Sequence, residues 1–141
     1  GYTKLVDKSI QTTRRFDALK VWVSFQTRGV EGWSNLISTS MENAQYLYSQ
    51  LAKDSDFDVV TNPEISSVVF RLSSSFCGNS DRDEVNKNVR RRLIHDEGGV
   101  TGQTVSNGGV CWKFTLLNPL ITHEKLDSLL VTIKELGNKA K

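Results

Sequence analysis

The sequence predicts an α+β fold of two layers, in which helices cover one face of a mostly antiparallel sheet. Three observations lead to this class. Long segments repeat their apolar residues every three or four positions, as amphipathic helices do. Shorter segments between them alternate apolar and polar residues, as half-buried strands do. An Asn-Gly-Gly turn at 107–109 joins two short segments into a hairpin, and strands joined in this way pair antiparallel.

The N-terminal part predicts a polar arm followed by two helices. Residues 1–15 are polar and show no period. In residues 16–27 apolar side chains crowd most of a helical wheel, which is typical of a helix buried on several sides, and Gly29 should end it. Apolar residues then recur at helical spacing over residues 31–53, which predicts a long amphipathic connector helix.

The middle of the chain predicts a turn, two strands and a helix. After a turn at 54–56, residues 57–61 alternate as a short strand that Pro63 ends. Residues 67–72 form the next strand, and residues 73–80 are rich in Ser, Gly and Asn, as loops are. Ser80 or Asp81 can cap a helix that runs to His95 with Val85, Val89 and Leu93 buried, before Gly98-Gly99 breaks it.

The C-terminal part predicts a hairpin and a closing helix. An edge strand at 100–105 turns at 107–109 into a strand at 110–117, which Asn118-Pro119 ends. In that second strand one face carries Trp112, Phe114 and Leu116, and the other carries Cys111, Lys113 and Thr115. Thr122 should cap the last helix, Gly137 should terminate it, and the remaining residues should fray.

Composition excludes several classes of protein. The net charge of +2 is too small to indicate nucleic-acid binding, and the basic run Arg90–Arg92 lies among acidic residues, as on a solvated helix face. No apolar run approaches the roughly 20 residues that cross a membrane. We therefore expect a soluble protein without nucleic-acid or membrane partners.

The positions of the cysteines and histidines in the sequence do not predict a metal site. Cys77 and Cys111 are the only cysteines, and neither they nor His95 and His123 have metal-ligand spacing. Two thiols in a chain of this size fit a reducing cytoplasm, although a disulfide between them stays open.

Two basic positions are candidates for chemistry in a sequence that otherwise holds no catalytic motif. Lys113 lies in the middle of a strand between two aromatic residues, where an ammonium needs water or an anion. It can equally lie on an exposed sheet face with its stem over apolar neighbours. Arg14 and Arg15 stand where a helix begins, and such guanidinium pairs bind carboxylates or phosphates or form interdomain ion pairs.

Several motifs together resemble group II pyridoxal-phosphate-dependent amino-acid decarboxylases. The first is the run from Ser9 to Trp22, which contains Arg-Arg-Phe-Asp-Ala-Leu-Lys. It continues with Arg-Gly-Val-Glu-Gly-Trp at 28–33 and Ser-Val-Val-Phe-Arg-Leu at 67–72. Near the end come Trp-Lys-Phe-Thr-Leu-Leu-Asn-Pro at 112–119 and Glu-Leu-Gly at 135–137. The resemblance extends over essentially the whole chain.

The resemblance implies the last third of a fold type I enzyme that acts as a homodimer on an amino-acid substrate. Residues 1–30 would close its large domain, and residues 31–141 would form its C-terminal small domain. The family holds pyridoxal 5'-phosphate on a lysine that follows a histidine. No such pair occurs here, so the chain is expected to bind no cofactor covalently and to be inactive without the N-terminal part of the enzyme.

The resemblance also implies roles for the two basic positions. Lys113 matches the position where glutamate-type members carry an arginine that pairs with the substrate carboxylate. Lysine keeps the charge but loses the fork, which resembles the diaminobutyrate and siderophore-type lysine branch. L-2,4-diaminobutyrate is therefore the expected substrate, with glutamate and lysine open. Arg14 matches the family arginine at the helix entry, near the site or at the dimer contact.

The first residue of the chain indicates a boundary inside a longer protein. Gly1 is not a translation start, and the resemblance places it near a mobile loop, so we expect a boundary made by proteolysis or cloning. The rival is a stand-alone α+β interaction domain without cofactor. A piece of a larger enzyme should expose an apolar patch, above all on the helix predicted at 16–27.

Overall fold

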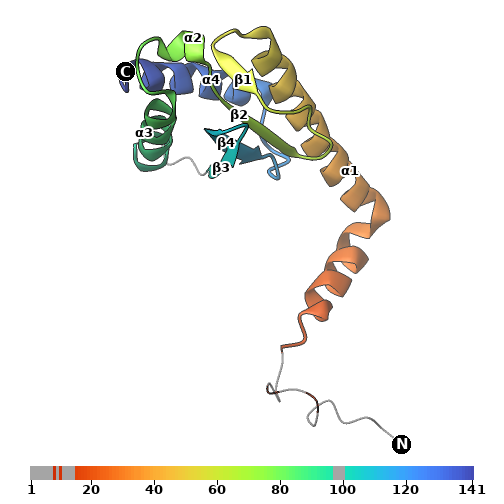
Figure 1. Cartoon of the computed structure of the whole chain (residues 1–141). Coiled ribbons are helices and arrows are strands. Elements are labelled where there is room, and N and C mark those ends of the chain that lie inside the picture. Colours follow the sequence, from red (N-terminus) through yellow and green to blue (C-terminus); the bar gives the residue numbers. More distant parts are fainter. Residues whose placement is uncertain (1–7, 9, 11–14, 97–100) are drawn as a thin grey trace, which may run out of the picture. The chain divides into compact units, whose positions relative to one another are not determined.

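The computed structural model describes residues 8, 10, 15–96 and 101–141 (Figure 1). The chain divides into two compact units, Gly1–Asn35 and Leu36–Lys141, which are described separately. Within the described residues, no helix has both the length and the apolar composition that crossing a membrane requires.

The first unit contains the beginning of helix α1, whose bounds are Ala18–Lys53. Gly29 interrupts this helix with φ 68° and ψ 175°, a backbone conformation that favours glycine. The predicted stop at Gly29 is therefore a kink, after which the helix resumes. Trp33 packs back over the kink, because its ring lies 5.7 Å from that of Phe25 and its Nε1 donates to the carbonyl of Ser24 at 3.3 Å.

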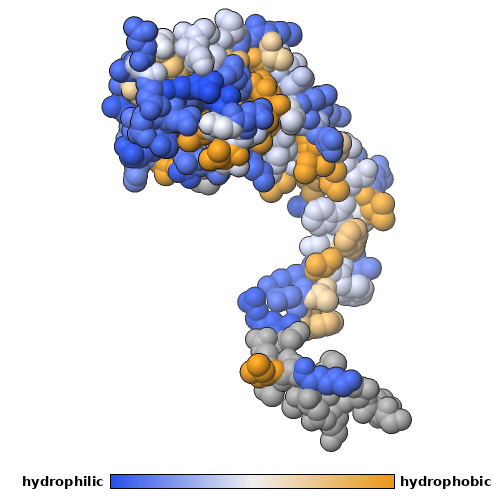
Figure 2. Space-filling model, viewed as in Figure 1, coloured by the Kyte–Doolittle hydropathy of each residue, from blue (hydrophilic) through white to orange (hydrophobic). Residues whose placement is uncertain are grey.

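The apolar side chains of this unit are exposed, as expected of a piece of a larger enzyme, so the burial typical of such an apolar helix is not provided by the described residues of the unit. Trp22 is 61% exposed and Val21 is 60% exposed, although they belong to the most apolar stretch of the sequence. Figure 2 shows apolar surface along this segment. The same holds for the other large apolar residues between positions 16 and 30, namely Phe16, Leu19, Val23, Phe25 and Val30. The residues of this unit that the structure describes leave these side chains largely uncovered.

The second unit is built on a four-stranded antiparallel sheet in the order β1-β2-β4-β3. The strands are β1 Phe57–Val59, β2 Ser67–Leu72, β3 Gly102–Ser106 and β4 Gly109–Thr115. Both β1 and β4 end two residues before the predicted limits. The predicted hairpin is confirmed, since Asn107 and Gly108 have φ of 49° and 70° between β3 and β4. The predicted edge position of β3 is confirmed as well, while residue 100 lies outside the described part.

The core lies between the sheet and the helices, and the predicted two-layer arrangement is confirmed (Figure 1). The helices of this layer are the C-terminal part of α1, α2 Ser74–Cys77, α3 Arg82–His95 and α4 His123–Asn138. Alternate residues of the two central strands face them, as predicted. The largest fully buried side chains among these strand residues are Trp112, Phe70, Leu72 and Val68.

Asn86 ties α3 to both central strands. Its side chain is fully buried, accepts from the backbone amide of Leu72 at 2.9 Å and donates to the carbonyl of Arg82 at 2.7 Å. Its own carbonyl accepts from Nε1 of Trp112 at 3.0 Å. Buried polar groups are costly unless they are hydrogen-bonded, so this one residue fixes where the helix sits on the sheet.

The helix ends confirm two predictions and correct two. Asp81 caps α3 and Thr122 caps α4, each by accepting backbone amides of the first turn. The predicted loop at 73–80 contains the single turn α2, capped by Ser73. Gly137 does not end α4, which continues to Asn138; it is buried, and an added Cβ would lie 2.7 Å from a ring carbon of Phe76. Gly137 is thus required for close packing.

Candidate functional site

Lys113 lies in the middle of β4 on the sheet face that points away from the helices. Its partners in the register are Val69 of β2 and Gly102 of β3, and directly paired residues share a face. Its side chain is exposed, whereas the adjacent Trp112 and Phe114 are buried in the core. Within the described part of the chain, Lys113 takes part in no ion pair. Because it is exposed, the ammonium can meet an external anion.

Lys113 has Gly102 on one flank and the apolar Val69 on the other. Gly102 has no side chain there, and a Cβ added to it would lie at an ordinary contact distance of 3.5 Å from Cβ of Lys113. Two residues further along β4, Thr115 shares a hydroxyl hydrogen bond of 3.0 Å with Ser67. A cation with open space on one flank and hydroxyl groups nearby suits a carboxylate, which accepts hydrogen bonds only.

A second cation, Arg71, lies on the same face but is already paired. Its side chain is 10% exposed, and its Nε lies 3.5 Å from Oδ2 of Asp58. The same carboxylate oxygen lies 3.2 Å from Nη1 of Arg82. Nη1 of Arg71 also donates to the carbonyl of Ser106 and fills the space that Gly109 leaves without a side chain. Arg71 is therefore a structural cation, and the sequence alone did not single it out.

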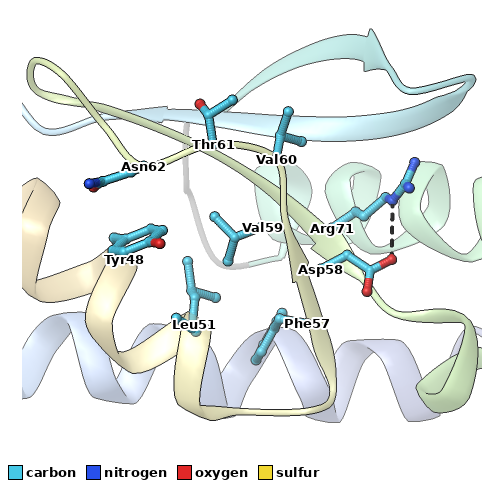
Figure 3. A pocket seen from close by; sticks show the side chains of 10 residues that line it. Tyr48, Leu51, Phe57, Asp58, Val59, Val60, Thr61, Asn62 and Arg71 are labelled. Atoms are coloured by element: carbon cyan, nitrogen blue, oxygen red, sulfur yellow. Dashed lines mark ion pairs between the residues drawn. The ribbon is translucent and has the colours of Figure 1, made fainter.

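A groove of about 600 Å³ opens beside β1 (Figure 3). Tyr48 and Leu51 of α1 line one wall, and Arg71 with its partner Asp58 lies on the other side of the strand. The remaining lining residues are Ala52, Phe57, Val59, Val60, Thr61 and Asn62. No lysine is among the lining residues, so this groove and the open face at Lys113 are different features.

The remaining candidates from the sequence do not join Lys113. Arg14 lies outside the described residues, and the adjacent Arg15 is exposed and 3.6 Å from Asp17. Cys77 and Cys111 are buried and free, so the disulfide left open is not formed; burial raises the pKa of the Cys77 thiol. The described part of the chain gathers no set of three or more His, Cys, Asp or Glu that could hold a metal ion.

Comparison with known protein families identifies a matching family. The conserved domain of the pyridoxal-dependent decarboxylases matches residues 2–73, which is just over half of the chain. The matched residues therefore include nearly all of the first unit, the rest of α1, and strands β1 and β2. The candidate at Lys113 lies beyond it.

Individual relatives extend the similarity over nearly the whole chain. L-2,4-diaminobutyrate decarboxylase of Acinetobacter baumannii is 29% identical over 94% of the chain and 26% of the relative. Aromatic-L-amino-acid decarboxylase of Bacillus atrophaeus is 30% identical over 92% of the chain and 27% of the relative. The crystal structure of the glutamate decarboxylase domain of diaminobutyrate-pyruvate transaminase and L-2,4-diaminobutyrate decarboxylase from Vibrio parahaemolyticus superposes with a TM-score of 0.81 at 30% identity, over 91% of this chain and 27% of that one. The chain thus spans about a quarter of the length of the curated relatives it matches.

Proposed function

The chain belongs to the pyridoxal-dependent decarboxylase family, and from this premise we propose that it is the C-terminal part of a decarboxylase that removes CO2 from an amino acid. Residues 1–30 then close the large domain, and residues 31–141 form the small domain. Pyridoxal 5'-phosphate supplies an electron sink for the carbanion that remains when CO2 leaves. The observation that carries the proposal is the exposed ammonium of Lys113, which forms no ion pair with the described residues, on an open sheet face of a chain with these relatives.

The described residues do not fit a cofactor site of their own. Lys113 is exposed and the groove beside β1 is lined by no lysine, so neither feature offers a water-excluded site for a cofactor lysine. Lys134 is engaged by Asp54 and Asp56. We therefore place the cofactor lysine in another part of the longer protein, and we propose that this chain is inactive alone.

Lys113 binds the substrate in this proposal. Its ammonium pairs with a substrate carboxylate and holds it against the open sheet face, where the missing side chain of Gly102 leaves room. A hydrogen bond between charged partners is about twice as strong as one between neutral groups. Because lysine presents a point charge and no fork, it sets the position of the carboxylate less tightly than arginine would.

The exposed apolar surface of the first unit indicates which protein partners cover it. Its exposed apolar side chains are too many for a surface that stays in water, and a small apolar pocket of about 230 Å³ opens among Lys20, Val21, Ser24, Phe25 and Trp33. We propose that the rest of the polypeptide and a second subunit of a homodimer cover this surface. The free thiols Cys77 and Cys111 support a cytoplasmic enzyme.

L-2,4-diaminobutyrate is the substrate we propose first. Relatives with this activity in their names share 29% and 32% of their residues with the chain over the matched parts. The aromatic-amino-acid relative at 30% identity keeps the substrate class broad, and glutamate and lysine stay open.

The decisive experiment measures CO2 release by the full-length enzyme with Lys113 changed. Lys113→Met should raise KM by about tenfold or more, the loss expected for one charged hydrogen bond. Lys113→Arg should keep most of the affinity, and Lys125→Met, which removes an exposed lysine of α4, should change nothing. An unchanged KM in Lys113→Met would show that Lys113 does not bind the substrate. Absence of CO2 release from every amino acid tested would contradict the proposal that the protein is a decarboxylase.

A further inference from the structure

We propose that Thr101 and Arg90 position Lys113, an inference that rests on the proposed function. The hydroxyl of Thr101 donates to the backbone carbonyl of Lys113 at 3.2 Å. Nε of Arg90 in turn donates to the backbone carbonyl of Thr101 at 3.1 Å. The two contacts connect α3 to the substrate-facing lysine through a single intermediate residue.

The hydrogen bond from Thr101 to Lys113 lies at the end of the hydrogen-bonded ladder between β3 and β4. The last pair in that ladder is Gly102 with Lys113, so β4 beyond Lys113 is paired only with β2. Thr101 immediately precedes this last pair, is 4% exposed, and also shares its hydroxyl with the carbonyl of Gly102 at 3.2 Å. Its hydroxyl therefore holds the backbone carbonyl of Lys113 at the point where the pairing with β3 ends.

Arg90 has a different role from its neighbours in the basic run. Arg91 donates to Asn88 on the same helix, and Arg92 is exposed. Arg90 is half-buried and reaches from α3 to the segment that leads into β3. An arginine that holds a main-chain carbonyl restrains the position of that segment, which an exposed charge does not. The basic run Arg90–Arg92, which its sequence predicts to be a solvated helix face, thus contains one arginine that is bonded to Thr101 beside Lys113.

The test uses the full-length enzyme and measures kcat and KM for CO2 release from L-2,4-diaminobutyrate, or from glutamate if diaminobutyrate is not decarboxylated. Thr101→Val removes the hydroxyl at similar size and should raise KM about fivefold while kcat changes less than about twofold. Thr101→Ser keeps the hydroxyl and should restore the native KM. Arg90→Ala should shift KM in the same direction, and Arg91→Ala is the matched control that should not.

A double variant separates positioning from general stability. If Thr101 acts through Lys113, Thr101→Val should add nothing to KM once Lys113→Met is present, whereas two independent effects would multiply. Multiplied effects, or an unchanged KM in Thr101→Val when Lys113→Met is impaired, would overturn the positioning role and leave the proposed function intact. Absence of CO2 release from every amino acid would overturn both.

Discussion

Lys134 of α4 joins two carboxylates of the turn that precedes β1. Its Nζ lies 2.5 Å from Oδ2 of Asp54 and 2.7 Å from Oδ2 of Asp56, with the ring of Phe57 below it. Partial burial would raise the pKa of Asp54, but the hydrogen bond and charge of Lys134 and the backbone amide of Asp56 together outweigh it, and the pKa lies below its usual value. Partial burial would lower the pKa of Lys134, but the two carboxylates raise it.

These two shifts set the pH range in which the cluster stabilises the fold. A lowered carboxylate pKa contributes stability above the usual value of about 3.9, and this is lost as the pH falls through the folded pKa of Asp54. A raised ammonium pKa contributes stability below about 10.4, and this is lost as the pH rises through the folded pKa of Lys134. The contribution is therefore complete at neutral pH.

Lys134→Met should lower the free energy of unfolding by about 1 kcal/mol at pH 7, because the cluster is only partly buried. Methionine retains most of the contact with Phe57. The difference between variant and native chain should shrink as the pH falls below the folded pKa of Asp54, as measured by urea unfolding at several pH values. Lys125→Met is the exposed control, and a pH-independent difference would contradict the ion-pair explanation.

Packing of whole elements depends on Gly137, which lets α4 approach α2 and the end of β2. An added Cβ would lie 2.7 Å from Cε1 of Phe76 and 2.8 Å from Cδ1 of Leu72. Leu72 is fully buried and has no free space to enter, whereas Phe76 is half-buried. The glycine costs α4 some intrinsic helix stability, and close packing of three elements offsets it.

Gly137→Ala should destabilise the chain by about 1–3 kcal/mol, since overpacking outweighs the gain of up to about 1 kcal/mol in helix propensity. Thermal or urea unfolding of the variant measures this. Asn138→Ala, at the next and exposed position of α4, is the control and should be near neutral or slightly stabilising. A more stable Gly137→Ala chain would show that Phe76 can move away at little cost.

The whole molecule combines a unit with a core of its own and a unit without one. The second unit buries apolar residues between its sheet and helices, whereas the first leaves large apolar side chains exposed. A stand-alone interaction domain would normally not leave so much apolar surface in water. The exposed surface therefore favours the proposed decarboxylase over the rival interpretation.

The isolated 141-residue chain should bind a hydrophobic dye and self-associate at micromolar concentration through this surface. The double change Val21→Lys and Trp22→Lys should reduce both effects, because it places charges in the exposed apolar stretch. Val131→Lys is the control, since Val131 is 57% exposed on α4 without such neighbours. Dye fluorescence and sedimentation measure the outcome; a monodisperse monomer without dye binding would favour the stand-alone domain.

The sequence by itself determined the features that arise within single segments. Alternation placed Trp112 in the core and Lys113 on the opposite face, and the residues at 107–109 specified the hairpin. The caps at Asp81 and Thr122 were also predictable, because a capping side chain bonds the turn next to it. The family was recognisable for a similar reason, since its motifs are contiguous runs.

Only the tertiary structure decided what depends on residues distant in sequence. Gly137 has the sequence signature of a helix end, but its role comes from Phe76 and Leu72. Arg71 and Lys113 are both strand cations, and only the fold shows that Asp58 pairs with the first. Likewise, α2 needs Ser73, whose hydroxyl also donates to the carbonyl of Ser55. Periodicity reports which way a side chain points, whereas close packing and charge pairing depend on neighbours that only folding brings together.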